Sequence, residues 1–253
     1  MATIGTWAIE TQGLVKAFAG FRAVDGVDLR LEAGLIHALV GPNGAGKTSL
    51  FNLLTGFLRP TAGRILLFGE DVTGLRPEAI SRRGVARSFQ ITSLFERISV
   101  QEHVVLALQA RAGEGYAFWR SAAALRRFDG RARELLDEVG LGGLAGRSAG
   151  NLPYGQKRAL ELALALALEP RLLLLDEPTA GMGAEDIERT TALIRRVRNG
   201  RSVVLVEHNM GVVASLADWV TVLAQGRILA EGPFDLVRAD PAVVTAYLGA
   251  AHA

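Results

Sequence analysis

Residues 41–48 read Gly41-Pro42-Asn43-Gly44-Ala45-Gly46-Lys47-Thr48 and satisfy the pattern G-x-x-x-x-G-K-[ST]. They lie between an apolar, strand-like run at residues 36–40 and a helix-like run at residues 49–54. This order indicates a phosphate-binding loop, because its glycines let backbone N–H groups surround phosphate oxygens at the start of a helix. We therefore expect Lys47 to reach the β and γ phosphates of a nucleotide and Thr48 to bind Mg²⁺.

The length and composition of the chain fit a globular enzyme. Its 253 residues suffice for one large domain, or for a core with a smaller inserted lobe. No apolar run approaches the roughly 20 residues that span a bilayer, and the first residues lack the charged and apolar regions of a signal peptide. Cysteine is absent. We therefore expect a soluble protein without disulfides, which fits the cytosol.

The charged residues and the histidines narrow the class of partner and cofactor. The net charge is only +2 and the 28 Lys and Arg residues are scattered along the sequence, so no nucleic-acid partner is expected. One local group of arginines fits either a solvated face or a surface that meets a partner or a membrane. This group is Arg82, Arg83, Arg87 and Arg97. The histidines lie too far apart in the sequence for a zinc site, at positions 37, 103, 208 and 252.

Hydrophobic periodicity predicts an α/β fold with an inserted helical lobe. Apolar or alternating runs typical of strands occur before residue 91 and again after residue 171, and helical spacing dominates between them. The run at 172–176 suits a strand covered on both faces of a parallel sheet. The expected strands are 7–11, 27–31, 36–40, 64–68, 85–89, 172–176, 202–206, 219–223 and 227–231. The expected helices are 49–54, 100–111, 125–139, 155–168 and 187–197, with small helices in 233–248.

Two acidic residues end the apolar run at 172–176. Asp176 is expected at the carboxyl end of a parallel strand, where ligands of such sheets bind, and could hold Mg²⁺ through a water. Glu177 would then lie beside the γ phosphate, where a carboxylate can orient and polarise the attacking water. The alternative is a carboxylate pair that only ends a strand before Pro178.

Two further polar residues follow expected strands. His208 comes after the apolar run at 203–206, so adjacent parallel strands would bring it to the sheet edge that carries Glu177. Its imidazole could bond the γ phosphate there and stabilise developing charge. Gln90 ends the expected strand 85–89, and its amide oxygen could reach the metal or the water. A lone surface histidine and a plain polar strand end are the respective alternatives.

Together these motifs resemble the ATP-binding cassette subunits of ABC transporters, over nearly the whole chain. The resemblance implies a P-loop NTPase core, with a RecA-like parallel sheet and an antiparallel β subdomain, formed by residues 1–90 and 159–253. It also implies an inserted α-helical lobe at residues 91–158. The chain would then be an ATPase that uses ATP and Mg²⁺.

The resemblance also implies roles for single residues. The Walker A residues 41–48 and Ser49 would bind the nucleotide, and residues 172–176 would be Walker B. The metal ligands would be Thr48, Asp176 and, in the Q-loop, Gln90. The catalytic residues would be Glu177 and the switch histidine His208.

A signature motif is implied immediately before a helix at 157–168. In the family this motif binds the γ phosphate of ATP held by the opposite subunit, through a helix N-terminus and backbone N–H groups. Its usual form is Leu-Ser-Gly-Gly-Gln, so a proline here replaces the serine and a tyrosine replaces a glycine. The residues are Leu152, Pro153, Tyr154, Gly155 and Gln156.

Two more positions are compared with the family. Phe18 lies 23 residues before Gly41, where the family has an aromatic residue that stacks on adenine. A core aromatic is the alternative for Phe18. Gly183 stands where the D-loop of the family often has an aspartate, so the cross-subunit contact made there is expected to differ.

Several stretches resemble the ATPase subunits of branched-chain amino acid importers in particular, namely residues 86–90, 151–156, 207–210 and 246–249. That resemblance implies a second ATPase subunit, identical or paralogous, two membrane-spanning permease subunits and, indirectly, an extracytoplasmic solute-binding protein. It implies a peripheral position at the cytoplasmic face of the inner membrane, where ATP-driven dimer closure powers transport. The same group includes importers of urea, short amides and aromatic acids, so the solute stays open.

Two other functions stay open as alternatives. The first is the ATPase of an exporter or a lipid-extraction system. The second is a cassette ATPase that acts in translation or DNA repair. Proteins of that second kind usually carry two cassettes, or coiled coils or zinc modules in the helical lobe, and this sequence has one cassette without such insertions.

Overall fold

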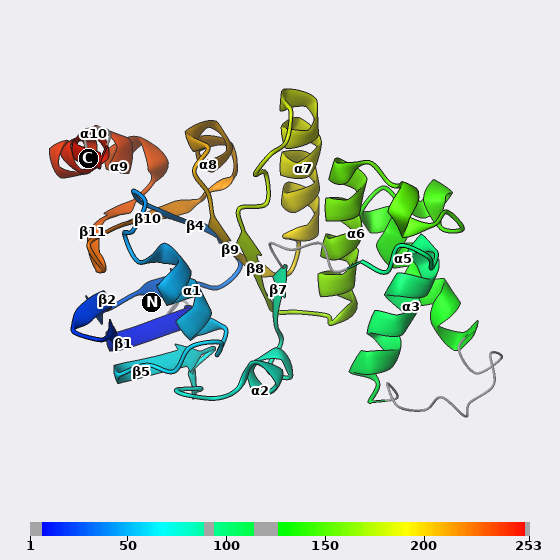
Figure 1. Ribbon diagram of the computed structural model, residues 1–253, viewed down its shortest axis with the longest axis horizontal. Coiled ribbons are helices and arrows are strands. Elements are labelled where there is room, and N and C mark those ends of the chain that lie inside the picture. Colours follow the sequence, from blue (N-terminus) through cyan, green and yellow to red (C-terminus); the bar gives the residue numbers. More distant parts are fainter. Residues whose placement is uncertain (1–6, 89–93, 114–125, 251–253) are drawn as a thin grey trace, which may run out of the picture.

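A mostly parallel sheet at the centre of the molecule carries the phosphate loop. The computed structural model describes residues 7–88, 94–113 and 126–250 (Figure 1). The strand order of the central sheet is β11-β10-β4-β9-β8-β7, with β11 antiparallel to β10 and the other neighbours parallel. The strands are β4 (Ile36–Val40), β7 (Val85–Ser88), β8 (Leu172–Asp176), β9 (Ser202–Val206), β10 (Trp219–Ala224) and β11 (Arg227–Gly232).

The inner strands of this sheet are short apolar runs because both faces are covered. Every residue of β4, β8 and β9 is buried. Leu39 and Asp176 both lie beside Val206, on either side of β9. The carboxyl ends of the three strands are therefore level, and the segments that follow them emerge at one edge of the sheet.

An antiparallel sheet and helix α1 (Lys47–Leu54) cover one face of the central sheet. Side chains of both sheets and of α1 share a buried core around Phe51, and α1 lies between the two sheets (Figure 1). The antiparallel sheet has the order β2-β1-β5-β6, with β3 also paired to β1. Its strands are β1 (Trp7–Phe18), β2 (Phe21–Val27), β3 (Arg30–Glu32), β5 (Ala62–Leu67) and β6 (Glu70–Asp71). Helix α2 (Pro77–Ser81) follows β6.

Helices cover the other face and extend beyond β7. α7 (Ala184–Val197) and α8 (Met210–Leu216) share a second core with the central sheet. α9 (Phe234–Ala239) and α10 (Pro241–Ala250) follow β11. Three helices form a group at one end of the molecule (Figure 1). They are α3 (Val100–Arg111), α5 (Asp129–Glu138) and α6 (Tyr154–Ala167), with short 3₁₀ turns η1 (Arg126–Phe128), η2 (Gly142–Leu144) and η3 (Ala149–Asn151).

Helix α6 links this helical group to the sheet. It packs on α3 and α5, and also on β7 and α7. The predicted boundary between residues 158 and 159 therefore falls inside a continuous helix. Helix α3 begins and ends where the sequence predicts, because Ser99 accepts from the Glu102 amide while Glu102 accepts from the Ser99 amide at 2.6 Å.

Several other elements differ from the sequence prediction. β1 runs on to Phe18, well past the predicted end at residue 11, because register shifts after Leu14 and after Lys16 interrupt the alternation without ending the strand. The strand predicted at 27–31 is the shorter β3, and β2, β6 and α2 are not predicted at all. α5 begins at Asp129, after the 3₁₀ turn η1, and not at residue 125.

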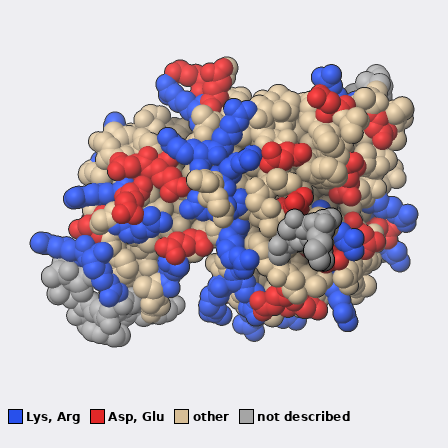
Figure 2. Space-filling view, turned by 180° about the vertical axis from the view of Figure 1, so that it is seen from behind, with Lys and Arg blue, Asp and Glu red and all other residues tan. Residues whose placement is uncertain are grey.

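The fold gathers charges that are scattered in the sequence. Lys and Arg side chains form a band down the middle of the face shown in Figure 2, which is the back of the view in Figure 1. The group of four arginines does not form one surface, because Arg87 points inward with 14% of its side chain exposed. Arg83 pairs with Glu70 at 2.7 Å, while Arg82 and Arg97 are exposed. Within the described ranges, no helix combines the length and the apolar character needed to cross a membrane.

Candidate nucleotide-binding site

The loop between β4 and α1 can be built only with glycine at two positions. A Cβ atom on Gly41, at φ 149°, would lie 2.2 Å from the carbonyl oxygen of Leu223. A Cβ on Gly46, at φ 99°, would lie 2.2 Å from the carbonyl oxygen of Ala23. The backbone of the loop is therefore wedged between β10 and β2. The tight turn leaves its N–H groups available for a phosphate.

Helix α1 begins directly from this loop with an uncompensated N-terminus. Gly46 is its N-cap, no side chain caps it, and its first turn holds no acidic residue. Free N–H groups and the helix dipole favour an anion at this point. Thr48 is exposed on the first turn and Ser49 is half-buried beside it. The loop residues Pro42, Asn43, Gly44 and Ala45 complete the turn that the sequence predicts.

Lys47 lies folded against the loop. Its Nζ donates to the carbonyl oxygens of Gly41 at 2.7 Å and Pro42 at 2.9 Å, and the residue is only 6% exposed. Burial lowers the pKa of Lys47, while the charge of Glu177 acts in the opposite direction. The ammonium group is thus held at the centre of the loop, within reach of any anion that the loop binds.

Asp176 is at the carboxyl end of β8 and forms a buried ion pair with Arg87. The Oδ2 of Asp176 accepts from Nη2 of Arg87 at 2.7 Å, and the aspartate side chain is 3% exposed. Arg87 also donates to Oδ1 of Asn52 at 2.6 Å, and its guanidinium lies 4.9 Å from the centre of the Phe51 ring. Sequence reasoning missed this partner. The signal was an arginine within the expected strand 85–89, next to the apolar residues Val85 and Ala86.

The side chains present here suit Mg²⁺ bound together with a nucleotide. Thr48 offers a hydroxyl and Asp176 a carboxylate, which are hard oxygen donors of the kind Mg²⁺ takes singly or in pairs beside phosphate oxygens. The residues that the structure describes hold no group of three or more His, Cys, Asp or Glu side chains that could cage a metal alone. The third predicted ligand, Gln90, lies outside the described residues.

Glu177 and His208 meet at the edge where β8 and β9 end. The Nε2 of His208 lies 2.9 Å from Oε1 of Glu177, and both side chains are partly exposed. Glu177 has φ 47°, and its amide donates to the carbonyl of Val206 at 2.9 Å. The structure thus brings together two residues that the sequence places 31 positions apart, as neighbouring parallel strands predict. Their catalytic roles stay predictions.

The signature residues form the start of α6 and do not precede it. Leu152 is buried and Pro153 is the N-cap, so Tyr154, Gly155 and Gln156 make the first helical turn. The start at residue 157 that the resemblance implied is wrong, and the start at residue 155 predicted from periodicity is one residue late, because proline suits the position just before a helix. The helix N-terminus has no side-chain cap and no acidic residue in its first turn.

Tyr154, which stands where the family has glycine, is tied to its own chain. Its hydroxyl donates to the carbonyl of Ala180 at 3.3 Å and accepts from Nε of Arg158 at 3.2 Å. The ring remains 44% exposed. The segment that contains Gly183, the N-cap of α7, is therefore joined to the start of α6 within one chain.

Phe18 lies at the end of β1 with 43% of its surface exposed, so the alternative of a core aromatic is wrong. The Nζ of Lys16 lies 4.9 Å from the centre of its ring. Phe18 pairs with Phe21, and β2 continues to Ala23, whose carbonyl faces Gly46 of the phosphate loop. The exposed ring is thus available to stack on a planar group beside that loop.

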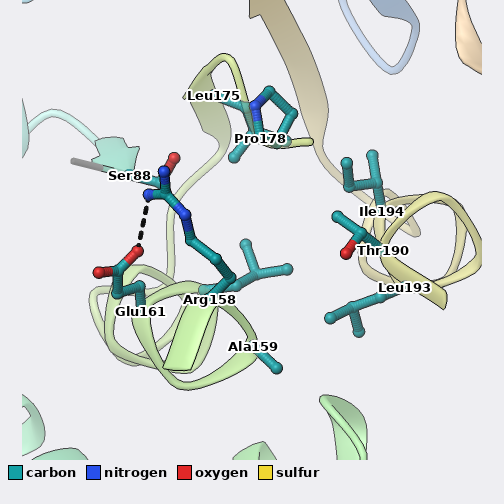
Figure 3. A pocket seen from close by; sticks show the side chains of 10 residues that line it. Ser88, Arg158, Ala159, Glu161, Leu175, Pro178, Thr190, Leu193 and Ile194 are labelled. Carbon is teal, nitrogen blue, oxygen red and sulfur yellow. Dashed lines mark hydrogen bonds and ion pairs between the residues drawn. The ribbon is translucent and has the colours of Figure 1, made fainter. Parts of the chain in front are cut away.

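A small cavity lies below the turn that follows β8, between α6 and α7 (Figure 3). Its volume is about 30 Å³, and Leu175, Pro178 and Thr190 line it together with the ion pair of Arg158 and Glu161, which spans 3.0 Å. A volume of this size holds about one water molecule. The cavity is therefore too small to hold a nucleotide.

The phosphate loop after β4, with an aspartate at the end of β8 and a glutamate beyond it, defines a P-loop ATPase. Residues 24–180 match the family model described as ABC transporter, and residues 227–253 match the model of branched-chain amino acid ATP-binding cassette transporters. The chain belongs to the ABC transporter family, as an ATP-binding cassette ATPase.

Known relatives agree with this assignment. The chain is 41% identical to the high-affinity branched-chain amino acid transport ATP-binding protein BraF of Pseudomonas aeruginosa, over 96% of this chain and 98% of BraF. It is 38% identical to the corresponding protein LivG of Escherichia coli K12, with the same coverage. A solved ADP-bound ATP-binding cassette of an ABC transporter superimposes with a TM-score of 0.85 at 28% identity, covering 96% of this chain and 99% of that one.

Proposed function

We propose that this chain is the ATP-hydrolysing subunit of an ABC importer for branched-chain amino acids or a related small polar solute. The hydrogen-bonded pair of Glu177 and His208 beside the phosphate loop carries the catalytic part of the proposal. The likeness to branched-chain amino acid transport proteins over nearly the whole chain supports the transport part. The separate match of the C-terminal residues 227–253 supports it further.

In the proposed reaction the loop binds the β and γ phosphates of ATP. Backbone N–H groups of the loop and the N-terminus of α1 supply the contacts. Lys47 transfers its hydrogen bonds from the carbonyl oxygens of Gly41 and Pro42 to phosphate oxygens, which restores a charged partner to a buried ammonium. Phe18 stacks on the adenine.

When it is bound, Mg²⁺ would neutralise part of the negative charge of the phosphates. Thr48 and Asp176 are the residues that would hold it, and Gln90 is proposed as a further ligand. Arg87 keeps the Asp176 carboxylate at the end of β8, since the two side chains are joined at 2.7 Å. The carboxylate is thus already oriented before a metal enters.

Glu177 and His208 act on the water that attacks the γ phosphorus. An ionised carboxylate can only accept hydrogen bonds, so Nε2–H of His208 donates to Oε1 of Glu177. This bond aims the Glu177 carboxylate, which orients the water and accepts its proton as the bond from phosphorus to ADP breaks. Once Glu177 has accepted the proton, Nε2–H of His208 turns from Glu177 to the γ phosphate and stabilises the charge that develops there.

A second cassette, identical or paralogous, completes the site in this proposal. Residues 152–156 at the N-terminus of α6, in the helical lobe assigned to residues 91–158, bind the γ phosphate held by the partner. ATP then favours a closed pair of cassettes, and its hydrolysis releases them. To shift the ratio of closed to open pairs from 1:99 to 99:1, ATP must bind the closed pair roughly 10⁴-fold more tightly, which corresponds to about 5.5 kcal/mol. The closing motion drives two permease subunits, from a peripheral position at the cytoplasmic membrane face, and a solute-binding protein delivers the substrate.

The test is ATP turnover of the transporter reconstituted in vesicles with its membrane subunits and binding protein. Glu177→Gln is expected to keep ATP binding and to lower turnover at least 10²-fold, because the general base is lost. Glu185→Gln is the matched control, because Glu185 is an exposed carboxylate on α7, and this variant should behave as the parent. Turnover in the Glu177→Gln variant equal to that of the control would refute the assignment of the base.

The same vesicles test the direction of transport and the class of solute. In vesicles whose cassettes and ATP are in the lumen, leucine, isoleucine or valine added outside with the binding protein should stimulate turnover and accumulate inside. If only urea, short amides or aromatic acids stimulate turnover, the proposed solute class is wrong and the stimulating solute takes its place. Export of the solute would refute the proposal that this transporter is an importer.

A further inference from the structure

Glu207 is a buried carboxylate that no step of the proposed reaction uses. It is 3% exposed and lies between the end of β9 and His208. Its Oε1 accepts from the amide of Thr179 at 3.0 Å and from the hydroxyl of Thr179 at 2.6 Å. Its Oε2 accepts from the amides of His208 at 3.1 Å and Asn209 at 3.3 Å. A charged group is thus taken out of water and satisfied by four donors.

These four donors belong to two separate loops. Thr179 is two residues beyond Glu177 in the loop after β8, and His208 and Asn209 belong to the loop after β9. Oε1 of Glu207 bonds to the loop after β8, and Oε2 bonds to the loop after β9. The side chain therefore joins the segment that carries Glu177 to the segment that carries His208.

Further hydrogen bonds also connect these neighbouring segments. The amide of Glu177 donates to Val206, and the imidazole of His208 meets the Glu177 carboxylate at 2.9 Å. The imidazole is 45% exposed, so surrounding side chains do not confine it. The relative position of the two side chains depends on the bridge that Glu207 makes beneath them.

The number of acceptor sites explains why a carboxylate stands here. An ionised carboxylate has about four lone-pair positions on two oxygens and can accept all four bonds. A glutamine has the same shape but one oxygen, and its amide group would face two donors. It can therefore hold one loop and must release the other.

We propose that Glu207 is a positioning residue that sets the separation of Glu177 and His208 and thereby the rate of ATP hydrolysis. The inference rests on the proposed catalytic roles of those two residues. Glu207 does not touch the nucleotide, so its loss lowers turnover and leaves ATP binding unchanged. A displacement of about 1 Å at a reacting group can cost about 10²-fold in rate.

The test uses the full chain in the reconstituted transporter and compares Glu207→Gln with Glu231→Gln. Glu231 is the matched control, since it also accepts a threonine hydroxyl, that of Thr221 at 2.7 Å, but lies on β11 outside the site. Glu207→Gln should lower kcat by about 10- to 100-fold with KM for ATP and the affinity for a non-hydrolysable ATP analogue within about 2-fold. Glu231→Gln should leave kcat unchanged.

A second step separates positioning from a general structural role. Residues that act as one unit have non-additive effects, so Glu207→Gln should cost less than about 2-fold in a His208→Ala background. A full 10-fold or larger further loss there would overturn the inference, because Glu207 would then act independently of His208. If the His208→Ala variant hydrolyses ATP at the parental rate, the proposed catalytic role of His208 is wrong. That result can be told apart from failure of the Glu207 inference, which the double variant tests.

A milder variant guards against loss of folding. Thr179→Val keeps the shape of the side chain and the amide donor but removes the hydroxyl that bonds Oε1. It should lower kcat in the same direction by a smaller factor, with unchanged affinity for the ATP analogue. Parental kcat in both Thr179→Val and Glu207→Gln, with normal unfolding midpoints, would refute the positioning role.

Discussion

Replacing Arg87 by methionine would remove the cation that neutralises Asp176 while keeping an unbranched apolar stem beside Phe51. The ion pair is buried, with side-chain exposures of 14% and 3%, and spans 2.7 Å. Removing one partner of a buried pair typically costs about 3–5 kcal/mol, because the other charge is left unpaired. The loss in free energy of unfolding has an upper limit, because protonation would remove the unpaired charge. Protonating a free aspartate side chain at pH 7 costs about 4 kcal/mol. We therefore expect Arg87→Met to destabilise the chain by about 3–4 kcal/mol.

The assay is urea unfolding of the purified chain, supported by its melting temperature. A loss of this size corresponds to a fall of roughly 6–16 °C for a chain of this length. Arg82→Met is the matched control, because Arg82 is exposed and should change stability by less than about 0.5 kcal/mol. The double variant Arg87→Met with Asp176→Asn should recover much of the loss, since the buried charge is then gone. An Arg87→Met variant as stable as Arg82→Met would refute the reasoning.

Two further predictions concern the loop and the pH dependence of folding. Gly41→Ala should abolish ATP binding in an equilibrium binding assay, because its Cβ would lie 2.2 Å from the Leu223 carbonyl oxygen; retained affinity would show that the loop can shift. Burial lowers the pKa of His37 to about 4, against the opposing charge of Asp218. The unfolded chain, with an ordinary histidine pKa near 6.5, binds the proton first, so stability is complete above that pH. It should fall by up to about 3 kcal/mol as the pH drops toward 4. In the His37→Leu variant, the urea midpoint should lack the part of the decrease between pH 6.5 and 4 that His37 causes. A midpoint that falls with pH as steeply as in the parent would contradict this prediction.

Features written in contiguous residues could be predicted from the sequence. The phosphate loop could be recognised because its glycines, lysine and threonine act through local backbone geometry. β4, β8 and β9 were predicted with their observed limits, since a strand covered on both faces must be apolar throughout. Helix α3 was predicted with its observed limits from helical spacing, and the bonds between Ser99 and Glu102 explain why it starts where it does.

Predictions failed where short elements depend on neighbours for their stability. The side chains of β2 do not alternate regularly between buried and exposed, and α2 has only five residues, so neither segment shows a clear pattern in its own sequence. Periodicity placed the start of α6 at residue 155, one residue late, and the family resemblance placed it at residue 157, three residues late, because Tyr154 and Gly155 do not signal a helix while Pro153 before them does. The domain limit at residue 158 divides this helix for the same reason.

The sequence by itself determined the class of chemistry, because the groups that bind phosphate and activate water lie in short motifs at the ends of recognisable strands. Only the tertiary structure decided which side chains support them. The residues around Arg87 predict a strand but do not show which way the side chain points, and the pairing of β7 with β8 turns it onto Asp176, 89 residues away. Glu207 joins Thr179 only because Asp176 and Val206 lie level across β8 and β9. Such partners are set by strand register, which is a property of contacts between distant segments and not of either segment alone.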